Sequence, residues 1–194
     1  MSSRTGSIAL EGELSSLMSE ARLLHSKATS VTSLSLVRQF GEQLDLELCS
    51  KTALLHDIAR ECPDDDLLAY AEEHHLPLEQ EEKGNPVLLH APVGAHLLMK
   101  RGYESSLCLA VRYHTLGSVH MGRFGLVLFI ADYIEPGRTH LSDRTRKELR
   151  AFPSLEMLCV EILRMQETYL QTKGKEPALC SMELKRYLLA GKRL

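Results

Sequence analysis

The chain has 194 residues, 44% hydrophobic and 25% charged, which is the balance of one ordinary globular domain with a sizeable core. The formal net charge of −3 and the sequence pI near 6.3 exclude a global positive field that would draw the protein to nucleic acid. Tryptophan is absent and aromatic residues make up 5%, which argues against a stacking platform for single-stranded nucleic acid.

The cysteines and the apolar runs indicate the compartment. The five cysteines form no C-x-x-C pair, and an odd number favours reduced, buried thiols over a disulfide framework. No apolar run is long enough for a signal peptide or for a membrane span. We therefore expect a cytoplasmic protein whose partners include neither nucleic acid nor a membrane.

Helical periodicity dominates the chain, and no segment shows convincing alternation of strand type. Residues 1–10 are expected to form a loose tail, and residues 79–86 (EQEEKGNP) a solvated loop. Glycine and proline mark the breaks between the other segments. Helices are expected near residues 22–41, 45–62, 64 onward, 92–101, 104–115, 121–134, 154–173 and 180–190.

This pattern predicts an all-α fold in the form of a single compact helical bundle. Residues 1–20 would form an N-terminal tail and a short leading helix. Residues 21–140 would form the core that carries the chemistry, and residues 141–194 would add C-terminal helices that pack on the same domain.

His56 and Asp57 are the first residues that point to chemistry. The apolar run of residues 53–55 places both at the end of a buried helical stretch. Neighbours on a helix differ in direction by about 100°, so both side chains can reach one cavity. An imidazole and a carboxylate together suit iron, manganese or zinc. By itself the dipeptide is a weak signal, because a capping aspartate beside a half-buried histidine gives the same pattern.

Three further residues strengthen the signal. His90 lies in VLLHAPVGAH at an expected helix start, and His114 lies in VRYHTLGSVH near an expected helix end. Asp132 lies in LFIADYIEPGR, where a lone carboxylate among apolar residues is costly unless it is paired or binds a metal. The remaining histidines lack such surroundings and are expected to be solvated or simply packed; these are His74, His75, His96, His120 and His140.

The order of these residues resembles the HD-domain superfamily with an expanded, two-metal site. The strings LLHDIA, LLHAPVGA, AVRYHTLG and IADYIEPGR resemble the bacterial symmetrical bis(5'-nucleosyl)-tetraphosphatase family. The likeness covers about residues 20–190, and ADYIEPGR together with HTLG is specific for that family, whereas the bare His-Asp pair is not.

The resemblance implies a first ligand histidine in an R-x-x-H-[ST] setting, which His25 satisfies. Without a gap before His56, Lys27 would take this position instead, and a protonated lysine coordinates a cation poorly. We prefer His25, because extra length is most easily accommodated in an interhelix loop. The resemblance then implies two metal ions, with iron expected first and manganese, cobalt or zinc as alternatives. Their ligands would be His25, His56, Asp57, His90, His114 and Asp132.

The resemblance also implies the reaction, which is symmetrical hydrolysis of diadenosine tetraphosphate to two ADP. His56, Asp57 and Arg60 are the expected catalytic residues, with Asp57 bridging the two metals. Guanidinium groups pair bidentately with phosphate oxygens, which makes arginines candidates to hold the substrate. The expected substrate-binding residues are Arg60, Arg138, His114 and Arg123.

Two departures from the family pattern concern these residues. Arg60 stands where the family usually has lysine, and Arg123 lies in a segment, 121–126 (MGRFGL), that replaces the usual acidic-basic pair. These departures leave two alternatives open. One is an HD phosphohydrolase for a deoxynucleotide, an alarmone or a cyclic dinucleotide. The other is a degenerate member that binds nucleotide or a protein without turnover. The sequence also leaves open whether the chain forms a homodimer.

Overall fold

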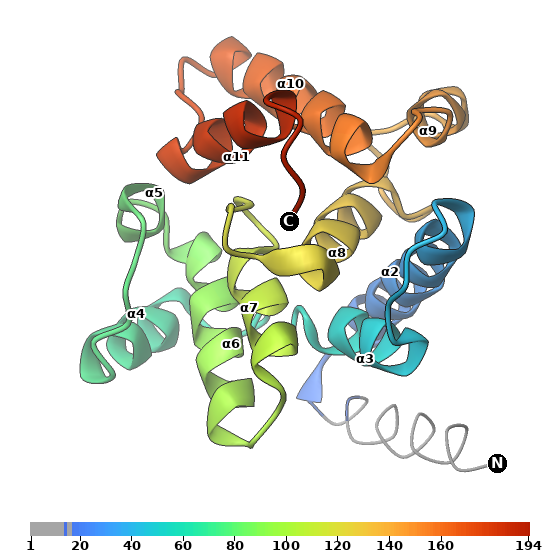
Figure 1. Cartoon of the computed structure of the whole chain (residues 1–194). Helices are drawn as coiled ribbons and strands as arrows, with labels where there is room; N and C mark the ends of the chain where they lie inside the picture. The colour runs from blue at the N-terminus through green and yellow to red at the C-terminus, as the bar shows by residue number, and fades with distance from the viewer. Residues whose placement is uncertain (1–13, 15–16) are drawn as a thin grey trace, which may run out of the picture.

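The computed structural model describes Leu14 and residues 17–194, and these residues form helices joined by short connections (Figure 1). The all-α prediction is therefore confirmed. In chain order the elements are α2 (Glu20–Gln39), α3 (Leu46–Leu55), α4 (Asp64–Glu73), α5 (Gln80–Lys83), the 3-10 helix η1 (Pro86–Leu89), α6 (His90–Lys100), α7 (Ser105–Tyr113), α8 (Gly122–Ile134), α9 (Asp143–Arg150), α10 (Leu155–Thr172) and α11 (Leu179–Leu189).

Helix α8 lies at the centre of the bundle (Figure 1). Residues 125–131 and Ile134 are all buried, so α8 is apolar on every side. A helix of this kind must be covered on every side, and α8 packs against α2, α3, α7 and α10. Asp132 interrupts this apolar sequence. The polar side chains that the surrounding helices contribute to the interior gather around it, at one point inside the bundle.

The predicted helices agree with the structure except in three places. The helix expected over residues 45–62 ends at Leu55, because His56 caps α3 and the chain continues in turns. The solvated loop expected over residues 79–86 is wrong. Helix α5 and η1 form there, and the Glu82 side chain is fully buried against Arg112. Helix α9 was not expected, since its sequence is almost entirely polar.

The turn between α7 and α8 depends on a glycine. Gly117 has a backbone φ of +72°, which other residues rarely adopt, and an added Cβ would lie 2.8 Å from Leu184 Cδ2 of α11. The chain can therefore leave α7 sharply and return as α8 beneath α11.

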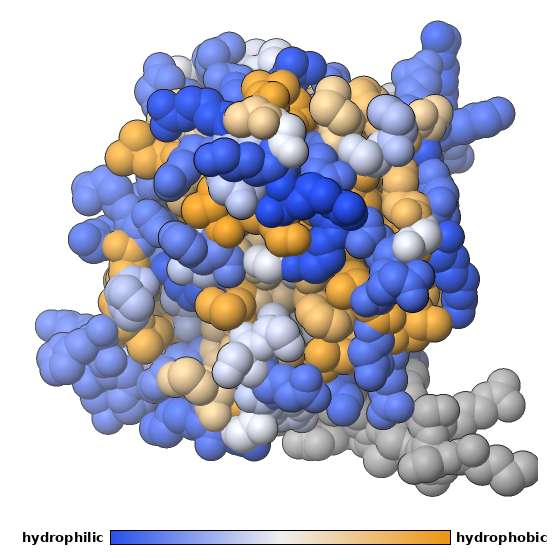
Figure 2. All heavy atoms as spheres, in the orientation of Figure 1, coloured by the Kyte–Doolittle hydropathy of each residue, from blue (hydrophilic) through white to orange (hydrophobic). Residues whose placement is uncertain are grey.

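The surface on one face mixes hydrophilic and hydrophobic residues (Figure 2). Among the described helices, none combines the length and the apolar character needed to cross a membrane. The tail expected over residues 1–10 lies outside the described residues.

Candidate metal centre

The structure brings all six expected metal ligands into one cluster beside α8. They come from five regions of the chain. His25 lies on α2, His56 and Asp57 follow α3, His90 begins α6, His114 follows α7 and Asp132 lies on α8. His25 contributes its Nε2 atom to this cluster, within 3.2 Å of His56 Nε2 and 3.0 Å of Asp132 Oδ1.

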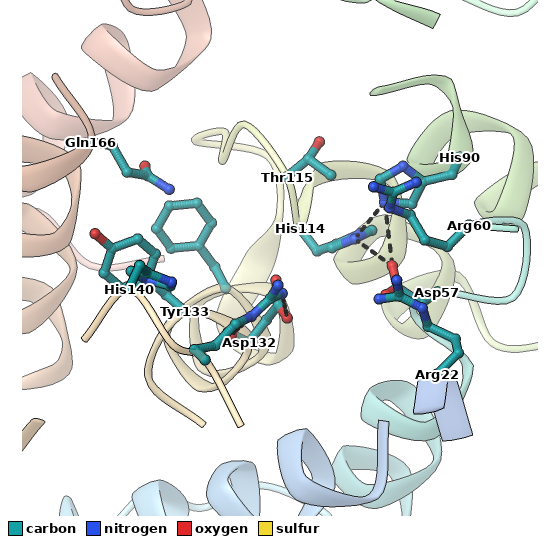
Figure 3. Close-up of a pocket in the computed structure, with 12 residues that line it drawn as sticks. Arg22, Asp57, Arg60, His90, His114, Thr115, Asp132, Tyr133, His140 and Gln166 are labelled. Atoms are coloured by element: carbon teal, nitrogen blue, oxygen red, sulfur yellow. Dashed lines mark hydrogen bonds and ion pairs between the residues drawn. The ribbon is translucent and has the colours of Figure 1, made fainter. Parts of the chain in front are cut away.

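Asp57 lies between two halves of this cluster. Its Oδ1 atom is 3.3 Å from His90 Nε2 and 3.5 Å from His114 Nε2 (Figure 3). Its Oδ2 atom is 3.5 Å from His56 Nε2 and 3.6 Å from His25 Nε2. One carboxylate thus presents a different oxygen to each pair of imidazoles, which is the arrangement that a bridging ligand requires.

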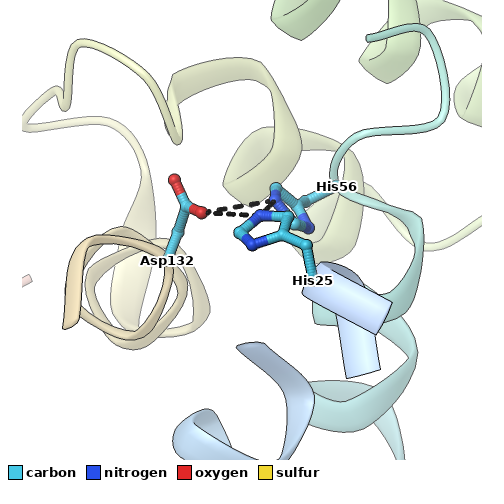
Figure 4. A group of neighbouring side chains, drawn as sticks. All are labelled: His25, His56 and Asp132. Atoms are coloured by element: carbon cyan, nitrogen blue, oxygen red, sulfur yellow. Dashed lines mark hydrogen bonds and ion pairs between the residues drawn. The ribbon is translucent and has the colours of Figure 1, made fainter. Parts of the chain in front are cut away.

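Asp132 completes the half that contains His25 and His56 (Figure 4). Its Oδ1 atom is 3.0 Å from His25 Nε2 and 3.6 Å from His56 Nε2. The two imidazole Nε2 atoms are 3.2 Å apart, as are those of His90 and His114 in the other half. Nitrogen and oxygen donors at this spacing, largely buried, fit a borderline cation such as iron or zinc.

The local fold orients three of the histidines in the same way. His56, His90 and His114 are the C-cap residues of α3, η1 and α7. Each Nδ1 lies 2.6–2.7 Å from the carbonyl oxygen three residues earlier, in Ala53, Val87 and Val111. The carbonyls of a last helical turn lack helical partners, so they accept hydrogen bonds from the ring N–H groups. Nδ1 therefore carries hydrogen, and Nε2 turns its lone pair toward the cluster.

His25 is held by a side chain instead. Its Nδ1 lies 3.1 Å from Glu135 Oε1, and Glu135 is 1% exposed. The backbone N–H of Gly137 donates to the other oxygen of Glu135, at 2.5 Å. A Cβ at position 137 would lie 3.0 Å from both Glu135 oxygens, so glycine allows the loop to close over this carboxylate. All four imidazoles thus have their Nδ1 atoms engaged and their Nε2 atoms facing one another.

The electrostatics of the cluster favour a bound cation. Burial acts to raise the pKa of Asp57, but the imidazoles of His56, His114 and His90 outweigh it and hold that pKa well below its usual range. Burial also acts to lower the pKa of His56, yet the Asp57 and Asp132 carboxylates raise it to about 9. The carboxylates are thus ionised, and a metal cation and a proton on His56 compete for the same negative charge.

A cavity of about 280 Å³ opens from the cluster (Figure 3). It is lined by Arg22, Asp57, Arg60, His90, His114, Thr115, Phe129, Asp132, Tyr133, Arg138, His140 and Gln166. Arg22 Nη1 donates to Asp57 Oδ2 at 2.6 Å. Two buried donors at its wall, Arg22 Nε and Thr115 Oγ1, have no hydrogen-bond partner among the described residues. Unsatisfied donors beside a cation site suit an anionic ligand.

The three arginines expected to bind substrate differ in their surroundings. Arg60 lines the cavity, and no carboxylate in the described part of the chain lies within salt-bridge distance of it. Arg138 also lines the cavity, where its guanidinium pairs with the Asp132 carboxylate and its Nε donates to the Asp132 carbonyl at 2.8 Å. Arg123 lies outside the cavity lining, in ion pairs with Glu42 and Glu156, so the expectation that it contacts substrate is not supported.

Sequence reasoning missed several residues of the site. Arg22 and Glu135 stood in quoted motifs, but only the fold reveals their contacts with Asp57 and His25. His140 was set aside because it has no apolar context, yet it lines the cavity. Tyr133 stands in the quoted string IADYIEPGR and Gln166 in an expected helix, but neither residue type by itself indicates that it lines a cavity. Two other histidines, His74 and His96, pack with Tyr70 away from the site.

Comparison with known proteins supports this reading. The family model of the HD domain matches residues 22–137. The symmetrical bis(5'-nucleosyl)-tetraphosphatase of Bacillus subtilis (strain 168) is 30% identical over 153 residues, which cover 78% of this chain and 72% of that protein. The protein of the same name in Staphylococcus aureus is 35% identical over 130 residues, covering 62% of this chain and 61% of its own length.

A solved structure is also similar over nearly its whole length. The crystal structure of a predicted HD superfamily hydrolase involved in NAD metabolism, from Clostridium acetobutylicum, superposes with a TM-score of 0.83 at 26% identity. The match covers 95% of this chain and 97% of that chain, so the helices outside the HD family model share its arrangement as well.

Proposed function

The chain belongs to the HD-domain family of phosphohydrolases, and on that premise we propose that it hydrolyses diadenosine tetraphosphate symmetrically to two ADP. One observation carries the proposal: Asp57 presents one oxygen to His90 and His114 and the other to His25 and His56. This donor arrangement supports a two-metal site. The names of the relatives supply the substrate class.

The cluster would hold two metal ions. His25, His56 and Asp132 would hold one ion, His90 and His114 would hold the other, and Asp57 would bridge them. Bound ions of this kind lower the pKa of a coordinated water and stabilise negative charge on phosphoryl oxygens. The donor set suits iron, manganese, cobalt or zinc, and we expect iron.

The arginines around the cavity would position the phosphates. Arg60, without a carboxylate partner among the described residues, is available to pair with a phosphate oxygen. Arg22 pairs with Asp57, and Arg138 pairs with Asp132. Either guanidinium can therefore present its remaining N–H groups to the substrate while it holds the carboxylate of a proposed metal ligand in place. These contacts would keep the central phosphates beside His114, in line for attack.

The first experiment measures metal content and ADP release together. We expect about two metal ions per chain in anaerobically purified protein, and ADP as the product from diadenosine tetraphosphate. The variants His56→Ala and Asp57→Ala should lose both metal and turnover, by at least about a hundredfold. His75→Asn is the matched control. His75 is exposed and outside the cavity lining, and asparagine tolerates its backbone φ of 48°.

The outcomes separate the alternatives. Full metal content and turnover in both variants would overturn the site. Two metals in the wild type without ADP release would leave a phosphohydrolase with another substrate, which a panel of deoxynucleotides, alarmones and cyclic dinucleotides would identify. Protein without metal that nucleotide nevertheless stabilises against heat would indicate a binding protein without turnover.

A further inference from the structure

A second cavity adjoins the metal centre. It has a volume of about 550 Å³ and is lined by Tyr133, His140, Leu141, Met165, Gln166 and Tyr169. Tyr133, His140 and Gln166 also line the cavity at the metal cluster, so the two cavities share a wall. In Figure 3 these shared residues lie on one side of Asp132, and Asp57, His90 and Arg60 lie on the other.

The chemistry of the lining changes along this path. The cavity at the metal cluster is bordered by charged groups, among them three arginines and two aspartates. The second cavity is bordered mainly by apolar and aromatic side chains from α8, the segment after it and α10. Pockets of about 300–1,000 Å³ with apolar walls and a few polar groups are typical of small organic ligands.

Two features suit a flat aromatic ligand. The rings of Tyr133 and His140 meet edge to face, with centroids 4.8 Å apart, and together form one wall of the second cavity. Burial and the neighbouring Arg138 and Arg146 lower the pKa of His140, so this ring is uncharged at neutral pH and does not attract phosphate. Tyr169 is 63% exposed at the rim, where its ring can stack on a base.

We infer that the cavity between Tyr133 and Tyr169 binds the purine base of one nucleoside diphosphate half of the substrate. Tyr169 and Met165 would contact the faces of the base, and the Gln166 amide, which both donates and accepts, would contact a polar edge. A tetraphosphate whose central phosphates lie at the metal cluster must extend outward on each side. The adjoining cavity receives one of these ends. The assignment rests on the proposed function for its substrate class.

The test compares two probes with the metal-loaded full-length protein: ADP, which carries a base, and pyrophosphate, which does not. Calorimetric titration gives the affinity for each. Met165→Ala and Tyr169→Ala should weaken ADP binding by about five- to fiftyfold, the effect of losing contact with one base, and leave pyrophosphate binding within about twofold. Tyr169→Phe, which keeps the ring, should bind ADP as the wild type does. Met157→Ala, on the same helix but outside this cavity, is the matched control.

The results distinguish this inference from the proposed function. Unchanged ADP binding in both alanine variants, an equal loss for both probes, or no ADP binding by the wild type would overturn the base site. If the wild type releases ADP from diadenosine tetraphosphate but the variants bind ADP normally, only the base site fails. If the wild type does not cleave that substrate, yet the variants lose ADP and keep pyrophosphate, the base site stands and the proposed substrate fails.

Discussion

At the residue scale, the clustered histidines are oriented by hydrogen bonds on the side away from the cluster. Three of them use a main-chain carbonyl of their own helix end, which is available wherever a helix stops. His25 lies inside α2, away from the helix end with its unpaired carbonyls, so it depends on the Glu135 carboxylate instead. Glu135 is therefore a positioning residue that acts on the cluster mainly through His25; its second route is Arg138, which lies 3.9 Å from Glu135 Oε1 and pairs with Asp132.

We predict that Glu135→Met lowers affinity for the metal that His25 is proposed to hold by about ten- to a hundredfold, because the Nδ1 proton loses its acceptor. Metal content measured against increasing chelator should fall from two ions to one at a lower concentration than in the wild type. Glu135→Gln, which keeps one acceptor oxygen, should be intermediate. Equal retention of both metals by the methionine variant, with an unchanged melting temperature, would contradict the positioning role.

At the scale of elements, a buried ion pair fixes the segment between α4 and α6. Glu82 of α5 is fully buried, and Arg112 of α7 donates to both of its oxygens, at 2.6 and 2.9 Å. The same guanidinium donates to the carbonyl of Pro77 at 2.9 Å. One arginine on a core helix thus holds a polar segment that has few apolar residues of its own, and this segment leads directly into His90.

We predict that Arg112→Met lowers the free energy of unfolding by about 3–5 kcal/mol, because it leaves the Glu82 carboxylate buried without a cation. Urea denaturation measures this difference. Arg144→Met is the matched control, since its partner Glu148 and Arg144 itself are exposed at 61% and 89% and such pairs contribute under about 1 kcal/mol. Similar small losses in both variants would mean that Arg112 does not anchor the segment.

At the scale of the whole molecule, Arg123 joins three parts of the chain. Its guanidinium lies between Glu42, which follows α2, and Glu156 of α10, and each of the three side chains is at most 13% exposed. Arg193 adds a second cation at the C-terminal end, 3.2 Å from Glu156. The α8 helix that carries Asp132 is thereby connected both to the helix of His25 and to the C-terminal helices.

We predict that Arg123→Met destabilises the protein by on the order of 3 kcal/mol at pH 7 and leaves metal content and ADP release unchanged. Burial acts to raise the pKa of Glu156, but hydrogen bonds and the Arg123 charge lower it below its ordinary value of 4.5. A lowered pKa gives stability that is present above 4.5 and is lost as pH falls through the folded-state value. The difference in free energy of unfolding between variant and wild type should therefore shrink below pH 4.5.

That prediction also separates two roles for Arg123. A raised KM for diadenosine tetraphosphate in Arg123→Met, with the free energy of unfolding unchanged, would support direct contact between Arg123 and the substrate, which its ion pairs argue against. Thermal or urea unfolding and steady-state kinetics on the same preparation decide between them.

The sequence by itself determined the helical architecture and the chemical identity of the cluster. Apolar residues at helical spacing identify most helices, and His56, Asp57, His90, His114 and Asp132 are conspicuous because each interrupts or borders an apolar run. Burying such groups is costly without a partner, so their presence in core segments already indicates that they meet.

Only the tertiary structure decided how those residues are supported and what lies beyond them. The position of His25 beside His56 and Asp132, the buried role of Glu82 and the internal pairing of Arg123 all depend on contacts between residues distant in sequence. A charged residue looks the same in sequence whether it faces solvent or a buried partner. The cavity beside Tyr133 depends likewise on the packing of α8 against α10, which no local pattern encodes.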